Sequence, residues 1–153
     1  MGVGNVAKRD AVNPEPELAG AGSKILLVDD QPFFNKLHSD MLLPRGYHVL
    51  VATSGREGIE LAQLHHPDLV LLDVEMPEID GFEVCRVLKE NKQTAQIPIV
   101  MLTATRDPKL NERAFRSGAA ATVQKSIKVE RILNIVQVVL QEKPKKTDSL
   151  IGL

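Results

Sequence analysis

Five short apolar runs alternate along the chain with five amphipathic segments, and this alternation predicts the fold. Apolar runs of this length, bounded by polar and turn residues, indicate strands that are buried on both faces. Such strands belong to parallel sheets that are covered by helices on either side. The predicted strands are Ile25–Val28, Tyr47–Ala52, Leu69–Asp73, Ile99–Leu102 and, as a weaker signal, Ala120–Gln124.

The segments between the strands have helical spacing and recognisable ends. Pro32 falls at a first helical position, where a missing donor is tolerated, and Pro44 to Gly46 stop this helix. Ser54 and Glu57 have the spacing of a capping box. Three more helices follow from the same reasoning: one from Asp80 to about Glu90, one from Asp107-Pro108 to Gly118, and a last one over about Ile127–Glu142.

Strand–helix alternation of this kind predicts an α/β fold with a doubly wound, five-stranded parallel sheet and helices on both faces. Right-handed crossovers leave few ways to wind such a sheet, and we expect the flavodoxin-like strand order 2-1-3-4-5. Residues 23–142 form the predicted domain. Residues 1–22 and 143–153 are predicted tails, because they carry Gly, Pro and mixed charge without a helical or strand period.

Composition excludes several classes of partner. The 153 residues suit one domain, and the net charge of −1 gives no electrostatic case for direct binding to nucleic acid or to an anionic membrane. Cys85 is the only cysteine, so an internal disulfide is impossible and a reducing compartment is expected. The start of the chain lacks the apolar core of a secretory signal, and we expect a cytoplasmic protein.

Polar side chains gather where the predicted strands end. Asp29 and Asp30 follow the first strand, Asp73 ends the third, Thr103 ends the fourth and Lys125 follows the fifth. Each residue alone would be read as a turn, a helix cap or a surface charge. Together they lie at the ends of four neighbouring strands, and three carboxylates at one edge repel unless a cation such as Mg²⁺ is bound. Carboxylates, Mg²⁺, a hydroxyl and an ammonium suit phosphoryl transfer with Asp73 as nucleophile.

The chain resembles the receiver domains of bacterial two-component response regulators, of the chemotaxis-regulator kind. The resemblance covers roughly residues 24–142 and rests on ILLVDD at 25–30, LVLLDVEMPEIDG at 69–81, PIVMLTA at 98–104, Gly118-Ala119-Ala120 and Lys125. It implies a signalling domain rather than an enzyme, one that assists its own phosphorylation and dephosphorylation. Its implied site residues are Asp73 as phosphoacceptor, Asp29, Asp30 and the backbone carbonyl of Glu75 as further Mg²⁺ ligands, Thr103 as switch hydroxyl and Lys125 as partner of a phosphoryl oxygen.

The resemblance also implies partners. These are a sensor histidine kinase or a phosphotransfer protein, a downstream protein that binds the face of the fourth helix, fifth strand and fifth helix, and possible homodimers. The sequence indicates neither direct nucleic-acid binding nor a membrane. Candidate contacts on the partner face are Arg106, Lys109, Arg113, Arg116, Ile135 and Val138. No output domain is evident after Glu142, so the chain is a stand-alone receiver or a piece of a larger regulator.

Two positions depart from the family pattern. Thr122 stands where the family usually has an aromatic residue, which puts the usual coupling of the switch threonine to a ring in doubt. Ser126 replaces the usual proline after the lysine, and a cis bond at a residue other than proline costs about 2.5–4 kcal/mol. We therefore expect the phosphorylation chemistry of the family to be kept. The way in which phosphorylation changes the surface of the domain is expected to be unusual.

Three alternatives remain at this stage. A Mg²⁺-dependent hydrolase with an aspartyl nucleophile would have a second Asp at position 75, where this chain has Glu75. A flavodoxin would have a phosphate-binding loop after the first strand, where Asp29 and Asp30 would repel phosphate. The main alternative is a pseudo-receiver, which binds proteins without being phosphorylated.

Overall fold

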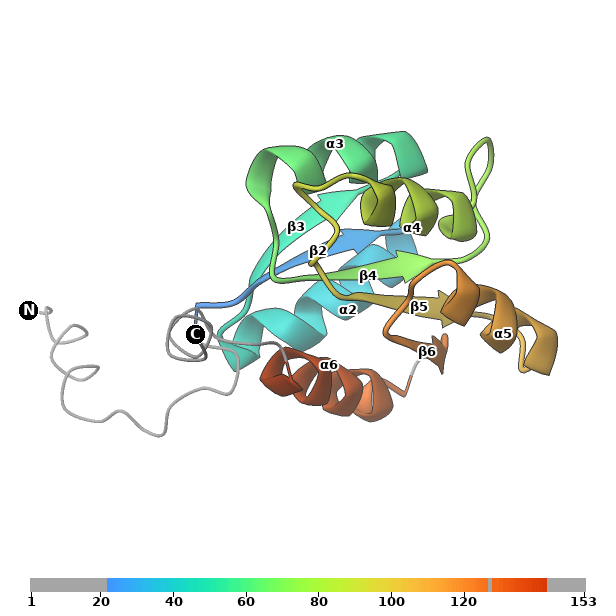
Figure 1. The fold of residues 1–153 in the computed structure, drawn as a ribbon. Helices are drawn as coiled ribbons and strands as arrows, with labels where there is room; N and C mark the ends of the chain where they lie inside the picture. The colour runs from blue at the N-terminus through green and yellow to red at the C-terminus, as the bar shows by residue number, and fades with distance from the viewer. Residues whose placement is uncertain (1–21, 127, 143–153) are drawn as a thin grey trace, which may run out of the picture.

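The computed structural model describes residues 22–126 and 128–142, which form a five-stranded parallel sheet between two layers of helices (Figure 1). The strand order is β3-β2-β4-β5-β6, which is the predicted order 2-1-3-4-5 counted along the described chain. Every neighbouring pair is parallel, so the carboxyl ends of the strands lie at one edge. The strands are β2 (Lys24–Val28), β3 (His48–Ala52), β4 (Leu69–Asp73), β5 (Ile99–Thr103) and β6 (Ala121–Gln124).

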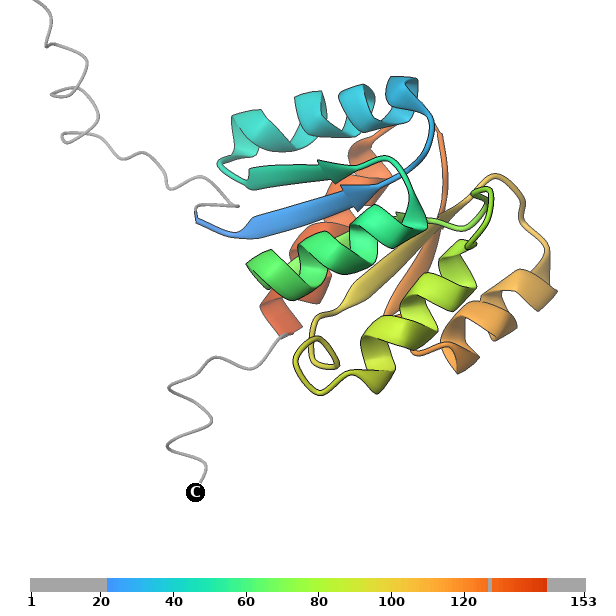
Figure 2. The ribbon, with the colours of Figure 1, turned by 90° about the horizontal axis from the view of Figure 1, so that it is seen from above.

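The helices divide between the two faces of the sheet (Figures 1 and 2). Along β2, Ile25 and Leu27 pack on the side of α2 and α6, whereas Leu26 and Val28 pack on the side of α3, α4 and α5. This alternation follows from the two-residue period of a strand. Because helices cover both faces of the sheet, all five residues of β4 are buried whichever face they point to. The helices are α2 (Pro32–Leu42), α3 (Gly55–His65), α4 (Gly81–Glu90), α5 (Pro108–Arg116) and α6 (Glu130–Glu142), with a 3-10 turn, η1 (Leu43–Arg45), after α2.

The predicted helix starts are confirmed for α3, α4 and α5. Ser54 Oγ accepts a hydrogen bond from the Glu57 backbone N–H at 3.1 Å, and Asp80 caps α4 through the Glu83 N–H at 2.9 Å. Asp107 caps α5 by accepting from the Lys109 N–H at 2.9 Å. The return bond of the predicted capping box differs by one residue. The Glu57 carboxylate accepts from the N–H of Thr53, whereas a regular capping box would use the N–H of Ser54.

Some predicted boundaries are wrong by one to three residues. Tyr47 precedes β3 and is buried in the core, and Ala120 precedes β6. The last helix begins at Glu130. Its predicted first residue, Ile127, lies outside the described residues, as do the predicted tails apart from Gly22.

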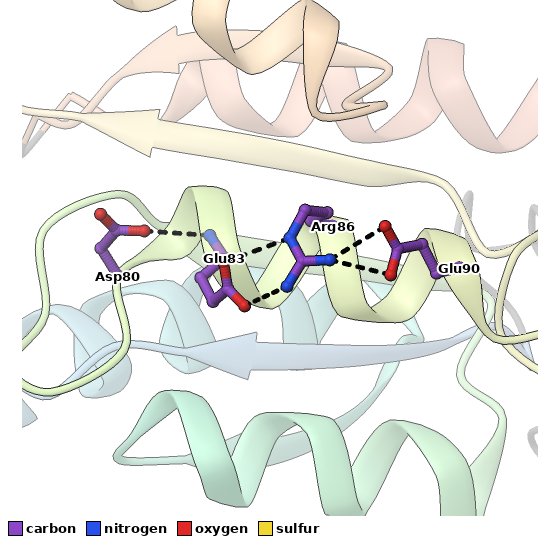
Figure 3. A network of polar contacts seen from close by, with 4 residues as sticks. All are labelled: Asp80, Glu83, Arg86 and Glu90. Carbon is purple, nitrogen blue, oxygen red and sulfur yellow. Dashed lines mark hydrogen bonds and ion pairs between the residues drawn. The ribbon is translucent and has the colours of Figure 1, made fainter.

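The outer face of α4 carries a row of charges (Figure 3). The Arg86 guanidinium lies between Glu83 and Glu90 and donates to Glu90 Oε1 at 2.8 Å. These side chains are about half exposed, so the pairs add little to stability. Within the described ranges, no helix combines the length and apolar character that crossing a membrane requires.

Candidate functional site

The sheet register brings the predicted site residues together. Val28 at the end of β2 pairs with Leu72, the residue before Asp73, and Thr103 at the end of β5 pairs with Gln124, the residue before Lys125. The Asp29 N–H also donates to the Ala52 carbonyl at 3.1 Å, which extends the sheet by one residue beyond β2. The four strand ends are therefore nearly level, and their polar residues lie at one edge.

Three carboxylates form a compact cluster at this edge. Asp29, Asp30 and Asp73 each place a carboxylate oxygen within 4.8 Å of the other two. Asp29 and Asp73 are buried, at 3% and 4% exposure, and Asp30 is more open to solvent. This grouping of oxygen ligands, two of them fixed by strand ends, is of the kind that Mg²⁺ binds.

Lys125 completes the cluster from the end of β6. Its ammonium Nζ lies 2.8 Å from Asp29 Oδ2 and 3.3 Å from Asp73 Oδ1, and it donates to Gln31 Oε1 at 3.2 Å. The side chain is only 7% exposed, so water screens these ion pairs weakly. The cluster thus has one ammonium for three carboxylates and keeps an excess of negative charge.

The pKa of Asp73 reflects this imbalance. Burial and, after it, the nearby charge of Asp29 raise the pKa of its carboxyl to about 6; Asp30 adds a smaller rise, and Lys125 opposes the change. The ionised form of Asp73 is therefore costly in the absence of a bound cation.

Two contacts hold Asp29 in place from α2. The Gln31 N–H donates to Asp29 Oδ1 at 2.9 Å, and the buried amide of Asn35 donates to the Asp29 backbone carbonyl at 2.8 Å. Gln31 is the N-cap residue of α2, so Asp30 does not cap this helix. Neither Gln31 nor Asn35 was predicted as a site residue; in the sequence, they are marked only by their position shortly after the acidic pair.

Thr103 is buried, at 4% exposure, but its hydroxyl faces its own loop. In the described part of the chain, its hydrogen bonds are both with Thr105: Oγ1 accepts from the Thr105 N–H at 3.1 Å and approaches the Thr105 carbonyl at 3.4 Å. The hydroxyl therefore lies at the predicted edge, and its hydrogen bonds there are with Thr105 and not with Asp73.

A small cavity of about 180 Å³ opens in front of Asp73. Glu75 lies on its rim in the loop after β4, where the resemblance places a backbone metal ligand. The loop folds tightly back on the strand, since the Gly81 N–H donates to the Val74 carbonyl at 2.8 Å and a Cβ on Gly81 would collide with the Asp73 carbonyl oxygen. The cavity is lined by Gln31, Phe34, Asp73, Glu75, Ala104 and Lys125.

The two unusual positions have clear local structures. Thr122 Oγ1 donates to Asn111 Oδ1 at 2.8 Å and so links β6 to α5. Close by, Arg106 Nε donates to Gln124 Oε1 at 2.6 Å. The peptide bond between Lys125 and Ser126 is trans, since the described residues contain no cis peptide bond. At position 122, where the resemblance implies an aromatic side chain, a polar pair thus links β6 to α5.

A doubly wound parallel sheet with an acidic cluster, a threonine and a lysine at its carboxyl edge defines a receiver-type α/β domain. The model of the response regulator receiver domain matches residues 25–137 of this chain. The chain therefore belongs to the response regulator receiver family of two-component signalling, as the sequence predicted.

Individual relatives agree with this assignment. The chain is 34% identical over 113 residues to the polar-differentiation response regulator DivK of Brucella ovis, a match that covers 74% of this chain and 92% of DivK. It is 39% identical over 118 residues to the transcriptional regulator RpaA of a Synechocystis species, covering 77% of this chain and 49% of RpaA. Among solved structures, chemotaxis protein CheY4 of Vibrio cholerae superposes with a TM-score of 0.74 at 33% identity, over 78% of this chain and 99% of CheY4.

Proposed function

We propose that Asp73 accepts a phosphoryl group from a histidine kinase, a phosphotransfer protein or a small phosphodonor, and that the phosphorylated domain regulates a protein partner. The observation that carries this proposal is the convergence of Asp29, Asp30, Asp73 and Lys125 beside a small cavity that Asp73 and Lys125 line. Asp73 lines this cavity, which offers an incoming donor a way to its carboxylate.

The cluster fits a Mg²⁺ ion. Three carboxylates with one ammonium leave excess negative charge, and the charges of Asp29 and Asp30 add to the rise in the pKa of Asp73 that burial causes. Asp29, Asp30, Asp73 and the Glu75 carbonyl would hold the ion. Bound there, Mg²⁺ would supply positive charge to the oxygens of the transferred group.

The protein side chains have defined tasks in the transfer. A carboxylate oxygen of Asp73 attacks phosphorus and forms an acyl phosphate, while the bond from phosphorus to the donor breaks and the electron pair leaves with the donor. Lys125, already 3.3 Å from Asp73 Oδ1, pairs with an oxygen of the arriving group. Hydrolysis of the acyl phosphate returns the carboxylate and ends the signal.

A chain of hydrogen bonds supports a route from the site to α5. Thr103 Oγ1 accepts from the Thr105 N–H, Thr105 Oγ1 accepts from the Asp107 N–H at 2.8 Å, and Asp107 caps α5. If Thr103 turns to a phosphoryl oxygen, its bond to Thr105 is lost and the cap of α5 is disturbed. This route does not need an aromatic side chain at position 122.

We infer that the partner binds the face formed by α5, β6 and α6. Val138 of α6 is 48% exposed on this face. Arg113 and Arg116, which were also predicted as contacts, are exposed on the side of α5 that faces α4, where both line a hollow with Phe82. The Arg116 guanidinium pairs with Glu112, and that of Arg113 stacks on the Phe82 ring at 4.1 Å. Displacement of α5 would move both guanidinium groups, so a partner could distinguish the two states.

Phosphorylation in vitro tests this function. Incubation with acetyl phosphate and Mg²⁺ should add one phosphoryl group to the intact mass, and Asp73→Asn should remove the reactivity. Equal labelling of parent and Asp73→Asn would contradict the assignment of the acceptor. An unlabelled parent protein would instead favour a pseudo-receiver that acts without phosphorylation.

A further inference from the structure

Lys125 has a fourth neighbour besides its three oxygen partners. The Phe34 ring of α2 lies with its centroid 4.1 Å from the Lys125 ammonium, within the range of a cation–π contact. The ammonium donates a hydrogen bond to Gln31 Oε1 and lies 2.8 Å from Asp29 Oδ2 and 3.3 Å from Asp73 Oδ1. The Phe34 ring adds a contact from α2 to the same ammonium.

The orientation of the Phe34 ring is set by its neighbours on the same helix. The Phe33 ring meets it edge-on, with centroids 5.0 Å apart and an interplanar angle of 84°. The imidazole of His38, one turn further along α2, lies 5.9 Å away and tilted by 32°. His38 is 1% exposed and anchors this row of rings in the interior. Phe34 is thus held as a wall of the cavity that Lys125 and Asp73 also line.

We propose that Phe34 is a positioning residue for phosphoryl transfer, because its ring holds the Lys125 ammonium beside the carboxylate of Asp73. This inference rests on the proposed function. A lysine side chain has four flexible bonds, and its three oxygen partners are themselves involved in metal or phosphoryl binding. Among these four neighbours of Lys125, the Phe34 ring is the one whose contact does not compete with a metal ion or a phosphoryl group.

The sequence alone suggests a different role for Phe34. Its spacing with Leu37 and Met41 places it on the apolar stripe of α2, as a core residue. A residue needed only for packing would be replaced adequately by leucine. A residue needed for its ring would be replaced by tyrosine and not by leucine, since only an aromatic ring attracts a cation through its face.

The test compares Phe34→Leu, Phe34→Tyr and the control Phe115→Leu. Phe115 of α5 is 78% exposed, so its variant applies the same change away from the site. The initial rate of labelling by acetyl phosphate with saturating Mg²⁺ should fall about tenfold in Phe34→Leu and stay within about twofold of the parent in the other two. Thermal melting of each variant identifies any loss of folding.

A second readout does not depend on phosphorylation. Ring currents from Phe34 should shift the ε-methylene resonances of Lys125 in the parent and in Phe34→Tyr, and the shift should disappear in Phe34→Leu. If Phe34→Leu labels at the parent rate, or if the Lys125 resonances are the same in all variants, the inference is overturned. If the parent protein is not labelled at all, the proposed function fails, whereas the resonances still report whether the ring lies on the lysine.

Discussion

Replacing Asp73 by asparagine should stabilise the folded protein at neutral pH when Mg²⁺ is absent. In the folded chain, burial and then the neighbouring carboxylates raise the pKa of Asp73 from its ordinary value of 3.8 to about 6. At about 1.36 kcal/mol per pH unit, this rise corresponds to about 3 kcal/mol of unfavourable free energy for the ionised form. Asparagine has nearly the same shape without the charge, so the variant should be more stable by up to about 3 kcal/mol.

The pH dependence of this difference follows from the direction of the pKa change. A raised pKa means that the folded state binds the proton more tightly than the unfolded state does. The contribution of Asp73 is therefore favourable at low pH and is lost as the pH rises from about 3.8 to about 6. The stability advantage of Asp73→Asn should be near zero below pH 4, should grow through this window and should be constant above pH 7.

Urea unfolding of parent and variant over this pH range measures the difference directly. Asp40→Asn is a matched control, because Asp40 is an exposed residue of α2 paired with Lys36, and such a change should have little effect. Saturating Mg²⁺ should reduce the advantage of Asp73→Asn, since it stabilises the folded parent by binding to it. An advantage that is absent at pH 7, or equally large at pH 4, would refute the electrostatic reasoning.

Three further predictions concern the metal, the loop and the switch. Asp30→Ala should weaken Mg²⁺ binding about tenfold or more in a titration, because Mg²⁺ has few protein ligands here, and unchanged affinity would remove Asp30 from the metal site. Gly81→Ala should lower the free energy of unfolding by about 1–3 kcal/mol, because its Cβ meets the Asp73 carbonyl and the backbone of Val74, and an unchanged urea midpoint would contradict that contact. Beryllofluoride should shift the amide resonances of residues 104–117 as well as those next to Asp73; shifts confined to the neighbours of Asp73 would mean that the signal does not reach α5.

The backbone positions of the site residues were predictable because buried parallel strands leave one place for polar side chains. Continuous apolar runs fix where β2, β4 and β5 end, and Asp29, Asp73 and Thr103 stand at those ends. The level alignment of the ends then follows from the parallel order of the sheet. These features depend on local pattern and topology, which a single sequence carries.

Contacts between distant elements were not predictable in the same way. Gln31 and Lys125 are 94 residues apart and meet only because α2 begins and β6 ends at the site. Phe34 has the spacing of a core residue, so nothing in its pattern distinguishes a ring that packs on Lys125. The hydrogen bond between Thr122 and Asn111 likewise depends on how α5 packs against β6.

The central claim, that Asp73 is the phosphoacceptor, is tested most directly by finding where the phosphoryl group is attached. After labelling with acetyl phosphate and Mg²⁺, borohydride reduces an acyl phosphate of aspartate to homoserine, which peptide mass spectrometry locates. The expected result is homoserine at position 73 alone, dependent on both acetyl phosphate and Mg²⁺. Homoserine at position 29 or 30, or a labelled protein in which no aspartate is reduced, would contradict the account.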